Sequence, residues 1–94
     1  MSIPLSSRER TQLKARAHHL KPIVQMGHAG LTDAFIVEVD RALAHHELIK
    51  VRISGDDREA RDAAAHEVCT RTGAASVQRL GNLVVLWRPK PEEV

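Results

Sequence analysis

With 94 residues, the chain is long enough for one domain with a modest core and too short for two. Its formal charge is +2 and its pI is about 9.1, which weakly favours an anionic partner. The single cysteine, Cys69, excludes an intramolecular disulfide and a CxxC metal site. Neither a signal peptide nor an apolar run of membrane-spanning length is found, so we predict a cytoplasmic protein.

The first predicted helix begins near the N-terminus. Ser6 and Glu9 fit a capping box, and the helix should run to about His19. Its apolar stripe consists of Leu13, Ala17 and Leu20. Beside that stripe stands a basic row at four-residue spacing: Arg10, Lys14 and His18. This row is either a solvated face or the edge of an anion-binding surface.

A glycine-containing turn follows the next apolar run. Residues 22–26 predict a buried strand, residues 33–46 an amphipathic helix, and Gly27 and Gly30 lie in the turn between them. Thr32 can cap the helix, whose free N–H groups and dipole favour a phosphate. Because a lone GxxG is a weak signal, a plain structural turn remains the alternative.

The rest of the chain predicts a strand, a helix and a hairpin. Residues 47–54 alternate, placing three β-branched residues on one side and Lys50 and Arg52 on the other. Asp56 can cap a third helix, with Glu59 completing a capping box, and Gly73 ends that helix. Two β-rich runs, 75–80 and 83–88, are joined by Gly-Asn, which is a strong hairpin signal.

The predicted order is therefore α-β-α-β-α-β-β in a single domain, residues 1–94. Its core spans about 7–90, and residues 91–94 form a frayed tail. Helical crossovers make the first three strands parallel with right-handed connections, and the hairpin turns the last strand back. The fold class is α/β of the two-layer α+β type, a four-stranded mixed sheet with helices packed on it.

Several segments in the right order resemble the CRM domain (chloroplast RNA splicing and ribosome maturation). They are residues 20–27, Gly30-Leu31-Thr32, residues 46–51, and the closing Gly81 with residues 84–89. The likeness covers roughly residues 7–90, although Trp87 stands where the family more often has tyrosine. It implies a fold like the C-terminal domain of translation initiation factor 3, with sheet order 1-2-4-3. It also implies RNA binding, and the stand-alone bacterial YhbY group is associated with precursors of the large ribosomal subunit.

The resemblance and the charges together indicate an RNA-binding surface. Its expected members are Gly27, His28, Ala29, Gly30, Thr32, Lys14, Lys21, Lys50 and Arg52. Family loops often carry Lys or Arg between the glycines, whereas this chain has His28-Ala29, which moves more of the affinity to the four cations. With two aromatic residues, the chain should read RNA backbone and shape rather than stack bases.

Other functions compete with binding to RNA of ribosomal precursors. A KH domain is disfavoured because its GxxG joins two helices. Catalysis is disfavoured because adjacent histidines on a helix point about 100° apart and no HExxH or cysteine–histidine signature occurs. We therefore expect no enzyme activity, cofactor, metal, membrane partner or small-molecule substrate. A chaperone or splicing-type binder of other structured RNA, or a protein-interaction module without RNA contact, remain alternatives.

Overall fold

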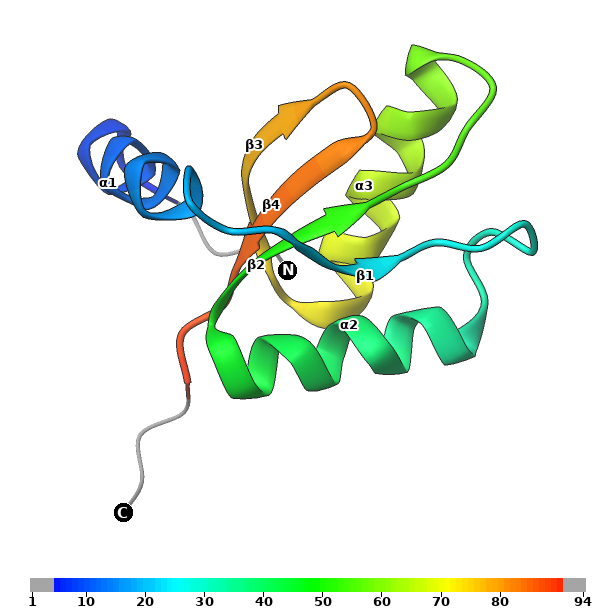
Figure 1. Cartoon of the computed structure of the whole chain (residues 1–94), viewed down its shortest axis with the longest axis horizontal. Helices are drawn as coiled ribbons and strands as arrows, with labels where there is room; N and C mark the ends of the chain where they lie inside the picture. The colour runs from blue at the N-terminus through cyan, green and yellow to red at the C-terminus, as the bar shows by residue number, and fades with distance from the viewer. Residues whose placement is uncertain (1–4, 91–94) are drawn as a thin grey trace.

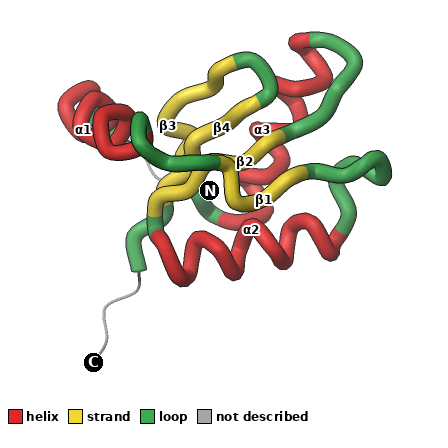
Figure 2. Tube along the Cα trace, in the orientation of Figure 1, coloured by secondary structure: helices red, strands yellow, loops and turns green. Residues whose placement is uncertain are grey.

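The computed structural model describes residues 5–90 as three helices and four strands (Figures 1 and 2). The order is α1 (Ser7–Ala17), β1 (Pro22–Gln25), α2 (Asp33–His46), β2 (Leu48–Arg52), α3 (Arg58–Thr72), β3 (Ala75–Leu80) and β4 (Leu83–Trp87). This confirms the predicted α-β-α-β-α-β-β order and fold class. The prediction of a frayed tail at 91–94 lies outside the described residues.

The four strands form one mixed sheet in the order β1-β2-β4-β3. Strands β1 and β2 are parallel, and β4 runs antiparallel to both of its neighbours, β2 and β3. Strands β1, β2 and β3 therefore point the same way, as the helical crossovers predict. The order 1-2-4-3 agrees with the one implied by the CRM resemblance.

Helices α2 and α3 cover one face of the sheet, which we call the closed face. Alternate residues of β2 and β4 point into it, among them Ile49, Val51 and Leu86, all of which are buried. From the helices come Val39, Leu43 and Val68, and small residues such as Ala64 and Ala65 allow α3 to approach closely. Phe35 is the only aromatic member of this aliphatic core within the described residues. Burial raises the pKa of the Cys69 thiol on α3.

Helix α1 packs on the opposite face, which we call the open face, and stands apart from α2 and α3 in Figure 1. Its buried residues Leu13 and Ala17 contact one residue from each of three strands: Leu48, Val77 and Val85. The Arg10 guanidinium of α1 donates hydrogen bonds of 2.5 and 2.9 Å to the carbonyls of Ser76 and Val77. Those carbonyls lie at the irregularity in β3, so α1 closes the bulge of this edge strand.

The predicted helix ends are largely confirmed. Ser6 and Glu9 form the capping box, Thr32 caps α2, and Gly73 ends α3 with φ +73°. The cap predicted at Asp56 is wrong: Asp57 is the N-cap of α3, and its Oδ1 accepts from the Ala60 N–H at 2.8 Å. Neighbouring aspartates have the same capping chemistry, so sequence alone could not choose between them, and with Asp57 the capping box disappears. Helix α1 ends at Ala17, two residues before the predicted end.

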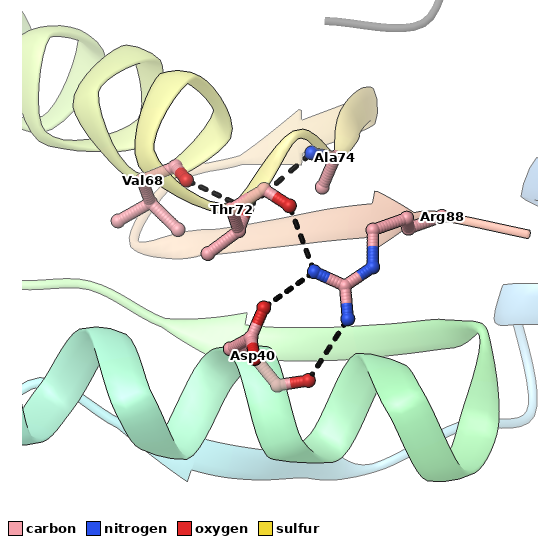
Figure 3. A network of polar contacts seen from close by, with 5 residues as sticks. All are labelled: Asp40, Val68, Thr72, Ala74 and Arg88. Atoms are coloured by element: carbon pink, nitrogen blue, oxygen red, sulfur yellow. Dashed lines mark hydrogen bonds and ion pairs between the residues drawn. The ribbon is translucent and has the colours of Figure 1, made fainter. Parts of the chain in front are cut away.

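An arginine after β4 ties the closed face together (Figure 3). The Arg88 guanidinium donates to the Asp40 carboxylate at 2.6 Å, to the Asp40 carbonyl at 3.1 Å and to the Thr72 carbonyl at 2.8 Å. Within the same group the Thr72 hydroxyl donates to the Val68 carbonyl at 2.7 Å. One side chain thus links α2, the end of α3 and the end of the sheet.

Candidate nucleic-acid interface

The turn at residues 27–32, here called the glycine loop, lies between β1 and α2 and projects beyond the sheet in Figure 1. The Gly30 N–H donates to the Gly27 carbonyl at 3.0 Å, and Gly30 has φ +77°, a conformation that favours glycine. Gly27 has no positive φ, and a Cβ built there would meet nothing within 4 Å. The described fold therefore does not require glycine at position 27. A ligand that approaches the backbone at this point would require it, because a Cβ would stand in its way.

The loop leads into the N-terminus of α2. The Thr32 hydroxyl accepts from the Phe35 N–H at 3.0 Å, and the Thr32 carbonyl accepts from Ile36. The N–H groups of Asp33 and Ala34 have no acceptor among the described residues. At this positive end of the helix, however, stands the Asp33 carboxylate, which is paired with Arg71 at 2.7 Å. The loop therefore offers backbone donors beside one negative side chain.

Three adjoining hollows run along β1 and β2. The first, about 330 Å³, lies between the end of α1 and these strands; the second, about 390 Å³, follows β1; the third, about 370 Å³, lies beside the hairpin turn at Asn82. Lys21 and Ile23 line both the first and the second, and Gln25 and Arg52 line both the second and the third. The hollows thus share lining residues and follow one another along β1, an arrangement that we call the track, and Met26, next to the glycine loop, lines the third.

Five cations line this track, and we call them the basic strip: Arg16, Lys21, Lys50, Arg52 and Arg61. No Asp or Glu is among the described residues that line the three hollows. The four strands themselves contain no carboxylate. The three ion pairs found within residues 5–90 all use carboxylates of α2 or α3: Arg71–Asp33, Arg79–Asp62 and Arg88–Asp40. The basic strip consequently keeps its positive charge.

The structure brings most of the predicted cations together. Lys21, Lys50 and Arg52 belong to the basic strip, whereas Lys14 is exposed on α1 and lines none of the three hollows. Lys14 and Arg16 flank the buried Leu13 on opposite sides of the helix, because successive residues are turned by about 100°. His28 and Ala29 are exposed at the tip of the glycine loop.

Two members of the basic strip were missed by sequence reasoning. Arg16 lies in the last turn of α1, and Leu20, which also lines the first hollow, lies beyond the end of that helix, so helical spacing does not relate the two. Arg61 had no signal in the sequence either. Its side chain folds back over Gly55, where an added Cβ would lie 2.9 Å from the Arg61 Cγ, so only glycine admits this packing. The buried Nε of Arg61 has no hydrogen-bond partner among the described residues.

Comparison with known protein families identifies the chain. The profile of the CRS1 / YhbY (CRM) domain matches residues 5–88. The chain belongs to the CRM family. A Haemophilus influenzae protein named RNA-binding protein is 44% identical over 88 residues, which cover 94% of this chain and 89% of that one. A Pseudomonas aeruginosa protein named probable RNA-binding protein is 35% identical, with coverage of 94% and 85%.

A solved structure has the same fold as this CRM chain. It is the solution structure of a Staphylococcus aureus protein considered a candidate for RNA binding, with a TM-score of 0.83 and 27% identity. The match covers 97% of the present chain and 95% of the Staphylococcus chain. The similarity thus extends over the whole domain, including α1 and both edges of the sheet.

The described part of the CRM domain shows no metal centre and no membrane-spanning helix. No group of three His, Cys, Asp or Glu residues in residues 5–90 could hold a metal ion. His18–His19 and His45–His46 are neighbouring rings with centroids 5.4 and 6.3 Å apart, and His46 lines the first hollow. No helix in this range is long and apolar enough to cross a bilayer.

Proposed function

We propose that this CRM protein is a non-enzymatic, cytoplasmic RNA-binding protein of ribosome biogenesis that binds ribosomal RNA of the large-subunit precursor. The observation that carries the proposal is the basic strip: five cations along three neighbouring hollows without a lining carboxylate. The names of the Haemophilus and Pseudomonas relatives, both RNA-binding proteins, support it. The ribosomal target follows from the likeness to the stand-alone YhbY group.

The arrangement suits a phosphate backbone better than a small anion. Lys21 lines the first and second hollows, and Arg52 lines the second and third. The cations therefore follow a line and do not converge on one point. A chain of phosphates can contact such a line in succession, and each contact releases bound counterions. The glycine loop at one end of the track adds backbone N–H donors for a further phosphate. Gly27, His28, Ala29, Gly30 and Thr32 are its proposed contact residues, and Lys14 is a peripheral one.

Sedimentation of cell extracts tests the ribosomal part of the proposal. The protein should migrate with immature large subunits during active growth and much less with mature ribosomes. Crosslinking in cells, followed by sequencing of the attached RNA, should recover large-subunit ribosomal RNA. Recovery of other structured RNAs alone would instead favour a chaperone or splicing-type role.

Titration with a transcript of large-subunit ribosomal RNA at several salt concentrations tests direct binding. The logarithm of affinity should fall steeply with the logarithm of salt concentration, with a slope of roughly −3 to −5 if the basic strip contacts one phosphate per cation. Absence of binding at physiological salt would indicate a protein-interaction module and overturn the proposal.

A further inference from the structure

Strand β1 is irregular at Ile23. Pro22 pairs with Lys50 and Val24 with Val51, so two steps along β1 match one step along β2. A bulge turns its extra residue out of the regular alternation, and bulges often lie beside binding sites. Ile23 is 53% exposed, so its apolar side chain is accessible to a ligand. Because Ile23 lines both the first and the second hollow, the bulge places it within the basic strip.

The first hollow is lined by both apolar side chains and cations. Leu20, Ile23 and Leu48 supply apolar surface, and the cations are Arg16, Lys21 and Lys50. Its volume of about 330 Å³ lies at the lower end of the range for small-ligand sites, which is about 300–1,000 Å³. Such a space admits a planar group of the size of one base and excludes a base pair within a duplex.

We propose that the first hollow holds one unpaired nucleobase of the bound RNA, while Arg16, Lys21 and Lys50 contact the phosphates on either side of it. An unstacked base has two apolar faces and is joined to a phosphate on each side, which matches a hollow lined by apolar side chains and cations together. Protein recognition of single-stranded RNA commonly uses bases turned out in this way. The inference rests on the proposed RNA binding and adds a base contact to the backbone contacts expected from the sequence.

Charge favours a nucleotide over an apolar protein segment as the occupant. Covering the hollow with an apolar peptide would remove three cations from water without a carboxylate among the lining residues to pair with them. RNA brings the compensating charge with it. Its phosphates contact the cations, while the base replaces water against Leu20, Ile23 and Leu48.

A pair of oligomers that differ only in their bases tests the inference. Fluorescence anisotropy with the full chain would compare single-stranded oligoadenylate of about ten nucleotides with an abasic ribose-phosphate oligomer of the same length. Both carry the same charge, so their phosphate contacts should contribute equally. We expect the oligoadenylate to bind at least about fivefold more tightly. Ile23→Ser should reduce that ratio to near one.

Val37 supplies the matched control. It is a β-branched residue on α2 with 52% exposure, nearly that of Ile23, and Val37→Ser should leave the ratio unchanged. Photocrosslinking gives a second readout. An oligouridylate containing 4-thiouridine should become attached to peptides that include residues 20–23 or 48–50. Circular dichroism would verify that both variants are folded.

The outcomes separate this inference from the proposed function. Equal binding of the intact and abasic oligomers would overturn the base site and leave RNA binding in place. If the protein bound neither the two oligomers nor ribosomal RNA, both the base site and the proposed function would be overturned. If Ile23→Ser abolished self-association in sedimentation equilibrium and left the ratio unchanged, the first hollow would be a contact between copies of the chain, and the base site would be wrong.

Discussion

The closed and open faces use the same four strands and differ in how their charges are compensated. On the closed face, arginines bind carboxylates of α2 and α3, as Arg88 does with Asp40. On the open face, α1 covers part of the sheet, and Lys50 and Arg52 stand beside hollows without a lining carboxylate. The difference shows that net charge is a poor guide to a binding surface. Within residues 5–90, the placement of the acidic residues is more informative than the excess of two positive charges in the whole sequence.

Removing free charge from the open face should have the largest effect. The double variant Lys50→Ala, Arg52→Ala should bind ribosomal RNA about a hundredfold more weakly, or by about 2.7 kcal/mol. The loss should be similar for RNAs of different sequence, because phosphate contacts do not read bases. The salt slope should decrease by about one to two units, because each lost phosphate contact accounts for just under one. Parallel titrations at several salt concentrations measure both quantities.

The matched control removes two charges from the other side. Arg41 is exposed on α2 and Arg79 is paired with Asp62 at 2.5 Å, so Arg41→Ala with Arg79→Ala changes net charge by the same amount. We expect an affinity within about threefold of that of the unmodified chain. Equal losses in the two double variants would show that net charge alone drives binding, and the contrast between the faces would be wrong.

The paired arginine of the closed face should affect folding instead. Arg88→Met leaves the Asp40 carboxylate and the Thr72 carbonyl without their donor, so the free energy of unfolding should fall by about 2 kcal/mol. Urea denaturation measures this change. RNA affinity at a temperature where the variant is folded should be unaltered. A specific loss of RNA binding with unchanged stability would assign Arg88 to the interface.

The glycine loop should respond to the sign of an added charge. If its N–H groups hold a phosphate, Ala29→Asp should reduce RNA affinity about tenfold, or about 1.4 kcal/mol, while stability holds. Ala29→Lys should raise affinity about threefold, or about 0.65 kcal/mol. Affinities of both folded variants within a factor of two of the original would exclude this loop from the interface.

Asp33 should oppose RNA binding, because its carboxylate stands beside the glycine loop. Asp33→Asn removes that charge and releases Arg71, so affinity should rise by about twofold, or about 0.4 kcal/mol. Asp62→Asn is the control, since it releases Arg79 at the distant β3 edge and should not change affinity. A similar gain in RNA affinity from both variants would show that the effect comes from net charge and not from the position of Asp33.

The smallest expected effect concerns the start of α1. Hydrogen bonds from the Ser6 backbone and side chain lower the pKa of Glu9 below its ordinary value. A group whose pKa is lowered on folding stabilises the folded state above its unfolded pKa, and this contribution is lost as the pH falls through the folded value. The stability gap between the unmodified chain and Glu9→Gln should therefore shrink on acidification. Thermal unfolding of both chains, measured from neutral to acidic pH, tests this prediction. A stability gap that does not change with pH would show that the charge of Glu9 does not stabilise the start of α1.

Local patterns predicted the elements well because each depends on neighbouring residues. The alternation in β2, the stop at Gly73 and the hairpin after Leu80 all follow from short-range chemistry. Spacing also gave strand directions, while the order 1-2-4-3 came from the CRM resemblance. What could not be predicted depends on distant partners. Arg10 bonds to carbonyls 66 and 67 residues away.

The candidate site shows the same limit. Lys50 and Arg52 were predicted because alternation places them on one strand face. Lys14 was chosen because it stands beside the predicted apolar stripe of α1, and the pattern could not tell which flank of that stripe lies next to β1 and β2. The bulge at Ile23 depends on register with β2, which no residue of β1 encodes alone. A basic side chain can therefore be recognised from sequence, but its neighbours across the fold cannot.

The shallow attachment of α1 has a consequence for the order in which the fold opens. Only Leu13 and Ala17 of this eleven-residue helix are buried, whereas α3 buries five of its fifteen residues. Amide protons of α1 should therefore exchange with solvent through local opening, before those of α3, which need a larger unfolding event. Because α1 supplies Arg16 to the first hollow, bound RNA should slow exchange in α1 and leave α3 nearly unchanged. Hydrogen exchange along this one helix would thus report occupancy without any label on the RNA.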